Sequence, residues 1–253
     1  MLDEEDLREA ALAALVASTA LLLGVVLLAP PGPPAAPERT ILRCGRVIDG
    51  RGGARAPAAV VVEGDRVTAV LDGEAPGSGK FVDLSNHTCL PGLIDVHTHL
   101  LFRPGSPVPD QALRETSSFR ALYGLAHARA LLEAGFTTIR DLGTEGAGYA
   151  DVALRTAIER RLFPGPRVLA ATLGITMTGG DDDRRGYSAE LSLPELSATA
   201  DGPDAVRRAV RTQIKHGADV IKVYATAGGS FSRPNPGLSL EELTVAVEEA
   251  RKQ

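Results

Sequence analysis

The sequence lacks several features that mark common classes of protein. It has only two cysteines, Cys44 and Cys89, which stand apart without Cys-x-x-Cys spacing, so neither a zinc knuckle nor a disulfide framework is expected. The formal net charge is −5 and no basic face is evident, which argues against nucleic acid as a partner. No nucleotide-binding glycine motif, serine nucleophile motif or internal repeat is found beyond an alternation of strands and helices.

Two histidines close an apolar run near residue 95. Segment 90–100 (LPGLIDVHTHL) places His97 and His99 one residue apart, after a turn at Pro91-Gly92. Side chains at i and i+2 leave a strand on the same face, so the two imidazoles are expected to project together, as ligands of a zinc-like metal do. The spacing therefore predicts a metal site, and the alternative is a pair of surface or loop histidines.

A lysine lies at the centre of a second apolar run, 218–229 (ADVIKVYATAGG). Such runs between helical segments indicate parallel strands buried on both faces, where an ammonium group is costly unless it is paired or chemically changed. Reaction of Lys222 with carbon dioxide would give an anionic carbamate whose two oxygens can bridge two divalent cations. The alternative is a lysine that extends to the strand end or pairs with a carboxylate.

Four blocks of the sequence together resemble the metal-dependent amidohydrolase superfamily, in particular its imidazolonepropionase-like and Xaa-Pro dipeptidase-like branch. In family order they are segments 90–100, 135–143 (GFTTIRDLG), 164–170 (PGPRVLA) and 217–229. The resemblance runs from about Thr40 to the C-terminus. It implies an α/β protein with a TIM-type (β/α)8 barrel, preceded by part of a small β-sandwich.

The same resemblance implies a site and a reaction. His97 and His99 would bind the more buried of two divalent metal ions, expected to be Zn²⁺, and Lys222 would be the carboxylated bridging ligand. A metal-activated water would hydrolyse a carbon–nitrogen bond in a small-molecule or short-peptide substrate, such as a cyclic amide, a dipeptide or an acyl amino acid.

Two further residues are candidate substrate contacts. Tyr224 lies two residues beyond Lys222 on the same strand face, and core packing is the alternative role. Asp181 follows the Gly179-Gly180 pair, where relatives commonly carry a histidine, and a solvated acidic loop is the alternative there. No other catalytic residue is identified.

Four of the eight barrel units can be recognised in residues 91–253. Their strands are expected at 92–100, 137–143, 167–175 and 219–226, and their helices at 116–134, 149–161, 204–216 and 239–252. A complete barrel takes about 250 residues, so this region is expected to be the N-terminal half of one.

The ligands that the family carries after later strands are not found. The sequence has five histidines, of which His87 is expected in a turn, His127 on a solvated helix face and His216 at a helix C-terminus. The aspartate that follows the eighth strand is missing too. A truncated product is the simplest expectation. The alternatives are a catalytically incompetent, membrane-tethered half barrel that acts as an interaction partner, and a chain completed by a separate C-terminal half or by homo-oligomerisation.

The front of the chain predicts a membrane anchor. Residues 10–29 form an uncharged apolar run long enough to span a bilayer, between a leader with five acids against Arg8 and a proline-rich linker at 30–38. The leader lacks a positive n-region, which favours an uncleaved single-pass anchor over a secretory signal. Arg39, Arg43 and Arg46 favour a cytoplasmic location for the folded part. Secretion, and a misassigned start that adds a fortuitous helix, are the alternatives.

Residues 39–90 are expected to form the partial β-sandwich. Alternation and turn residues predict short antiparallel strands at 40–49, 58–62, 66–71 and 81–84.

Overall fold

The computed structural model describes residues 38–105, 107–183, 187–188, 190–227 and 235–252. The chain divides into two compact units, Met1–Leu90 and Pro91–Gln253. The predicted anchor at residues 10–29 and most of the linker lie outside the described residues. Within the described ranges, no helix is long and apolar enough to cross a membrane.

The described part of the first unit is a five-stranded sheet. Its strands are β1 (Arg39–Ile48), β2 (Ala54–Arg55), β3 (Ala58–Glu63), β4 (Arg66–Asp72) and β5 (Lys80–Cys89). β1 pairs with β2 and β3 antiparallel, and β3 pairs with β4 antiparallel, as alternation predicted. The expectation was wrong for β5, which pairs parallel with β1 and continues to Cys89. His87 therefore lies in a strand and not in a simple turn.

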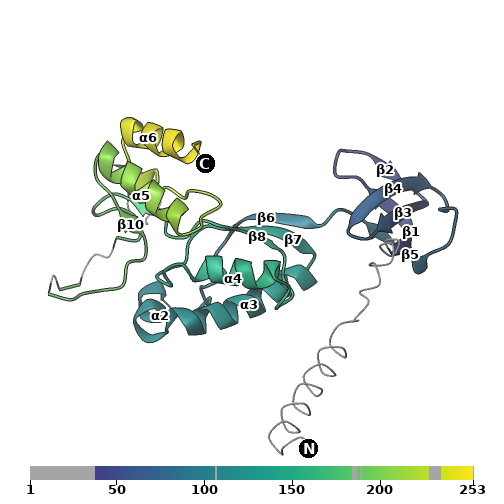
Figure 1. Cartoon of the computed structure of the whole chain (residues 1–253), viewed down its shortest axis with the longest axis horizontal. Coiled ribbons are helices and arrows are strands. Elements are labelled where there is room, and N and C mark those ends of the chain that lie inside the picture. The colour runs from purple at the N-terminus through teal and green to yellow at the C-terminus, as the bar shows by residue number, and fades with distance from the viewer. Residues whose placement is uncertain (1–37, 106, 184–186, 189, 228–234, 253) are drawn as a thin grey trace, which may run out of the picture. The chain divides into compact units, whose positions relative to one another are not determined.

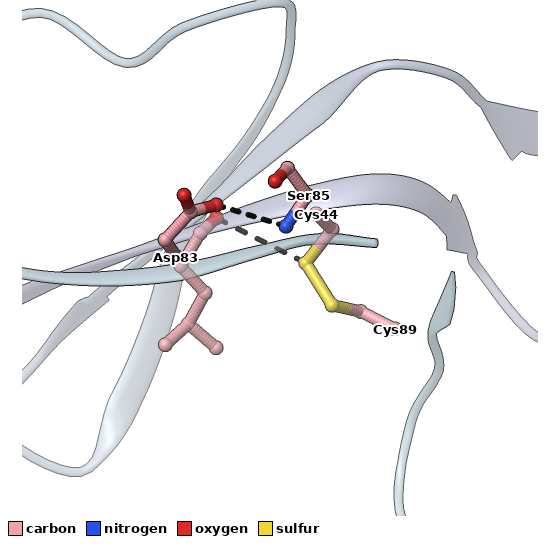
Figure 2. Close-up of a disulfide and its surroundings, with 5 residues drawn as sticks. Cys44, Asp83, Ser85 and Cys89 are labelled. Carbon is pink, nitrogen blue, oxygen red and sulfur yellow. Dashed lines mark hydrogen bonds between the residues drawn. A yellow bond between two sulfur atoms is a disulfide. The ribbon is translucent and has the colours of Figure 1, made fainter. Parts of the chain in front are cut away.

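A disulfide joins Cys44 to Cys89, with 6.0 Å between their Cα atoms (Figure 2). The sequence spacing indicated no disulfide framework, and the structure corrects this with one disulfide. The two residues are 45 positions apart in the sequence, and only the parallel pairing of β1 with β5 brings them together. Cysteine spacing alone carries no information about such a pairing.

The second unit begins as a parallel βα alternation. Its elements are β6 (Leu93–Thr98), α2 (Val108–Arg114), α3 (Ser117–Glu133), β7 (Phe136–Asp141), α4 (Ala150–Glu159), β8 (Arg167–Ala170), β9 (Ile175–Thr176), β10 (Ala198–Thr199), α5 (Pro203–Lys215), β11 (Thr226–Ala227), β12 (Asn235–Pro236) and α6 (Leu240–Ala250). The strands β6, β7 and β8 form one parallel sheet in that order. This is the beginning of a TIM-type barrel, and the predicted helices appear within a few residues of their expected bounds, with α2 as an addition.

Two clusters of apolar side chains form the core of this unit. The first joins β7, β8 and the turn after β6 to α3 and α4, which lie side by side along the sheet (Figure 1), with Leu101, Ile139 and Leu154 at its centre. The second joins β9 to α5 and α6 around Ile175 and Val210. In the first cluster α3 packs against β7 and α4 against β8.

The predicted fourth barrel strand, 219–226, is wrong as a regular strand. The segment is half-buried, and one isolated bridge, from Val223 to Ile175, gives it strand character before β11 begins. Its backbone is tied to the neighbouring segment through hydrogen bonds at Asp219, Lys222 and Tyr224. On the other side of residues 219–225, the described part of the chain offers no strand.

Candidate functional site

The candidate site is a cavity of about 570 Å³ in the second unit, where several strands reach their carboxyl ends. It is lined by His97, His99, Glu145, Asp181, Asp182, Lys222, Val223, Tyr224, Ala225 and Thr226. The structure therefore brings every site residue expected from the sequence to one cavity. It adds two residues that were not expected, Glu145 and Asp182.

His97 and His99 lie at the carboxyl end of β6, as their spacing predicted. Their ring centroids are 5.3 Å apart and the ring planes are tilted by 57°. The backbone N–H of His97 donates to Asp95 Oδ1 at 3.0 Å, which fixes the backbone before the pair. Partial burial and the positive charge of Lys222 lower the pKa of His97, so its neutral imidazole, the form that binds metals, is favoured.

Glu145 holds His99 in one orientation. Its Oε1 lies 3.0 Å from His99 Nδ1, and the carbonyl oxygen of Gly143 lies 3.2 Å from the same nitrogen. Burial acts to lower the pKa of His99, but the hydrogen bond and negative charge of Glu145 outweigh it and the pKa is raised. Because Nδ1 is engaged on the protein side, Nε2 is the ring nitrogen left for a ligand.

Lys222 and Tyr224 form the opposite wall of the cavity. Lys222 is half-buried, with Nζ 4.9 Å from the centre of the Tyr224 ring, so the full burial expected from the apolar run was wrong. The Tyr224 hydroxyl donates to Asp182 and not to Asp181. Burial and the bond to Asp182 raise the pKa of Tyr224. A side chain at Gly174 would start 2.6 Å from the Tyr224 ring, which shows how closely this wall packs.

Arg120, a buried arginine on α3, supports the loops that carry His99 and Glu145. Its guanidinium donates to the carbonyl oxygens of Leu101 at 2.7 and 2.9 Å, Thr144 at 3.0 Å and Glu145 at 2.7 Å. Its exposure is 0%. Sequence reasoning missed it, because an arginine in a helix is usually solvated. The loops after β6 and β7 are thus held by one side chain.

Asp141 is a second buried charge-bearing group, at the end of β7. Its Oδ1 accepts from the backbone N–H of Leu100 at 3.1 Å, while Oδ2 has no hydrogen-bond partner among the residues that the structure describes. Burial and the neighbouring Asp151 raise the pKa of Asp141 to about 8. A neutral, protonated carboxyl group is thereby favoured next to the turn that follows His99.

Of the positions expected for His216 and His127, the first is confirmed and the second is wrong. His216 caps the C-terminus of α5 as predicted, and its ring stacks on Tyr149 with 3.8 Å between centroids. The solvated position expected for His127 was wrong: the residue is half-buried, with Nδ1 2.9 Å from the carbonyl oxygen of Leu100. Neither ring lines the candidate cavity.

The donor set fits part of a metal site. Among the described residues, no group of three His, Cys, Asp or Glu side chains is arranged to hold a metal ion. His97 and His99 nevertheless offer two imidazoles to one cavity, and the bond from His99 to Glu145 is the support that metal-binding histidines usually have. A third ligand would have to come from Lys222 after modification or from outside these residues.

The fold and the position of the cavity define the class: this is a TIM-barrel-type α/β protein with its candidate site at the carboxyl ends of the barrel strands. Residues 88–253 match the model of the amidohydrolase family. The chain belongs to this family.

Individual relatives support the same placement. The chain is 32% identical over 243 residues to ochratoxinase of Aspergillus niger, a match covering 85% of this chain and 48% of that protein. A shorter match of 62 residues, 44% identical, covers 24% of this chain and 14% of an allantoinase of Streptomyces avermitilis.

Solved structures give the same picture. A Xaa-Pro dipeptidase with bound methionine superposes with a TM-score of 0.73 at 30% identity, covering 85% of this chain and 54% of that one. The A. niger ochratoxinase structure gives 0.71 at 27% identity, covering 86% of this chain and 54% of that one. The chain therefore spans about half the length of the relatives that it matches.

Proposed function

We propose that this chain supplies half of the active site of a metal-dependent hydrolase that cleaves carbon–nitrogen bonds. The observation that carries the proposal is the convergence of His97, His99 and Lys222 on one cavity at the carboxyl ends of barrel strands. Amidohydrolases generally use a divalent metal and hydrolyse such bonds. The names of the relatives, ochratoxinase and Xaa-Pro dipeptidase, favour small amides or dipeptides as the substrate class.

The chain's own residues have distinct roles in this proposal. His97 and His99 would hold the ion, expected to be Zn²⁺, through ring nitrogens that face the cavity. Lys222 would add an oxygen ligand once its neutral amine nitrogen bonds to the carbon of carbon dioxide and releases one proton. When bound, the metal supplies Lewis acidity that activates water and polarises a carbonyl group.

Glu145 is proposed as a positioning residue for His99. By accepting a hydrogen bond from Nδ1–H it fixes the tautomer in which Nε2 carries the free lone pair. Glu145 is itself 8% exposed and its backbone is held by Arg120, so the pair is set before any metal arrives.

Substrate contacts are proposed for the opposite wall. The Tyr224 hydroxyl is already bonded to Asp182, so the part of its ring that lines the cavity is proposed to contact an apolar part of the substrate. Asp181 lines the cavity with a carboxylate, which would accept a hydrogen bond from a substrate N–H group.

The remaining ligands are proposed to come from a C-terminal half barrel docked on this one. In the described part of the chain, β6 pairs with β7 and has no strand on its other edge. The edge exposes apolar side chains, with Ile94 at 65% and Val96 at 55% exposure. A further strand and helix would cover this edge, as barrel closure requires.

The test is metal-dependent amine release from Xaa-Pro dipeptides and N-acyl amino acids. The chain would be loaded with Zn²⁺ and assayed alone and after co-expression with the C-terminal half of a relative, with metal content measured in parallel. Release is expected on co-expression, and His97→Ala and Lys222→Ala should each abolish it and lower metal content. His216→Ala, outside the cavity, is the matched control. Absence of metal-dependent release in both preparations would overturn the proposal.

A further inference from the structure

The first unit contains a disulfide whose surroundings are shaped for it. Cys44 is fully buried in the core of the sheet, in a cluster with Val47 and Ala58, and Cys89 is packed against this cluster at the end of β5. The two cysteines are not direct neighbours in the strand register, where Cys44 faces Leu84. The backbone must therefore bend to bring Cys89 back to Cys44.

That bend is built into the pairing of β1 and β5. The register passes from Cys44–Leu84 to Arg46–Thr88, so β5 contributes extra residues opposite Gly45. A Cβ atom at Gly45 would lie 2.1 Å from the carbonyl oxygen of Ser85, so the irregularity requires glycine there. Asp83 Oδ1 accepts from the Ser85 N–H at 2.9 Å and fixes the start of the bend (Figure 2).

The burial and pairing of these cysteines indicate a structural disulfide. No free cysteine remains in the described residues, and both sulfurs are bonded to each other in an apolar cluster. Structural disulfides form and persist in oxidising compartments and are rare in the cytosol. The Cys44–Cys89 disulfide therefore favours an oxidising compartment as the place where the folded part of the chain works.

Two of the arginines that favoured the cytoplasm make contacts within the folded sheet. Arg39 and Arg43 lie within β1, where Arg39 donates to the carbonyl oxygens of Ser78 and Pro76 and Arg43 lies 3.7 Å from Glu74. All three arginines, Arg46 included, still lie within about 20 residues of the apolar run, where positive charges favour the cytoplasmic side, so the disulfide and these charges point to different compartments and the experiment below decides between them. On the amino side of the apolar run 10–29, Arg8 is the basic residue of the leader.

We propose that the folded part of this chain works outside the cytoplasm, in an oxidising compartment to which the apolar run 10–29 delivers it, and that Cys44 and Cys89 are oxidised there to a structural disulfide. The two thiols lose two protons and two electrons, which pass to the disulfide of a thiol oxidase. This inference is independent of the proposed hydrolytic function.

The experiment uses the full chain with a C-terminal epitope tag in a bacterial host that has a periplasm. Thiols are blocked with N-ethylmaleimide in intact cells and again during lysis, and peptides are mapped by mass spectrometry without reduction. Most of the protein should yield the peptide pair linked through Cys44 and Cys89. The linked fraction should fall several-fold in the same host without its periplasmic thiol oxidase. Cys44→Ser is the labelling control, because it leaves Cys89 free to be alkylated.

Location is measured separately in the same cells. Protease added to intact spheroplasts should remove the tag from the full chain, because the C-terminal part lies outside the cytoplasmic membrane. Alkylation of both cysteines in the full chain would overturn the proposal. So would a tag that the protease reaches only after the membrane is permeabilised.

Discussion

The two sheets of this chain are stabilised to different degrees. In the first unit, β1 pairs with β2, β3 and β5, and a disulfide ties it to the end of β5. In the second unit, β6 has one strand partner in the described part of the chain, and the segment that carries Lys222 joins through a single bridge. The two sides of the candidate site are therefore held differently. His97 and His99 lie at the end of a regular strand, while the segment with Lys222 is held by a few backbone hydrogen bonds.

Removal of the Arg120 side chain should have the largest effect, because this buried arginine holds the loops that follow β6 and β7 in the second sheet. Arg120→Ala would leave three buried carbonyl oxygens without their charged donor, at a cost of about 4 kcal/mol in the free energy of unfolding. Denaturant unfolding of the whole chain measures it. Arg129→Ala on the same helix, which removes an exposed i,i+4 pair with Glu133, should cost about 0.5 kcal/mol or less. Equal losses in both variants would contradict the role given to Arg120.

Reduction of the disulfide should reduce the difference in stability between the two sheets by weakening the first one. Breaking the Cys44–Cys89 bond with a thiol reductant should lower the stability of the first unit by roughly 2 to 4 kcal/mol, because the reduced unfolded chain gains freedom. Hydrogen exchange should show faster opening of β1, β3 and β5, with β6 to β8 unchanged. Unchanged protection in β1 after complete reduction would show that the crosslink adds nothing to this sheet.

Asp141 should make the second unit lose stability as pH rises. Its folded pKa of about 8 lies above the ordinary value of 3.8, so between these values the folded state binds more protons than the unfolded state. The contribution of Asp141 to the free energy of unfolding is therefore fully present below about pH 4 and is lost as the pH rises to about 8. Asp141→Asn should flatten this slope in unfolding experiments between pH 5 and 8, whereas Asp204→Asn, at an exposed site, should keep it. The same slope in Asp141→Asn and the native chain would refute the assignment.

The smallest effect is expected at the contact between α5 and α6. Arg211 and Lys252 hydrogen-bond to Glu249 and lower its pKa to about 2 from 4.5. The stabilisation is present above pH 4.5 and is lost as pH falls toward 2. Both partners are largely exposed, at 60% and 58%, so screening keeps the effect small. Glu249→Gln should remove part of the acid sensitivity seen by circular dichroism, and Glu248→Gln should not.

Much of the second unit could be predicted because its signals are local. Apolar runs and stops such as Gly135 and Gly217 placed the helices, and the i,i+2 spacing placed His97 and His99 on one side of β6. The assignment of these histidines as ligands stays a prediction. The position of the site could be predicted because the site residues directly follow the ends of predicted strands.

The parts that sequence could not predict depend on distant partners. Segment 219–226 forms one isolated bridge, from Val223 to Ile175, and an apolar run alone does not show how many such pairings a distant segment will make. The disulfide depends on the register of β1 with β5, and the role of Arg120 depends on carbonyl groups in two later loops. Glu145 had a weak signal, since it is an acid shortly after a predicted barrel strand.

Zinc affinity measured by equilibrium dialysis tests the central claim most directly. The native chain should bind about one ion, His97→Ala should lose it, and Glu145→Gln should bind about 10 to 100 times more weakly because His99 loses its orientation. His216→Ala should bind as the native chain does. Zinc binding that is unchanged in His97→Ala would contradict the assignment of this cavity as the metal site.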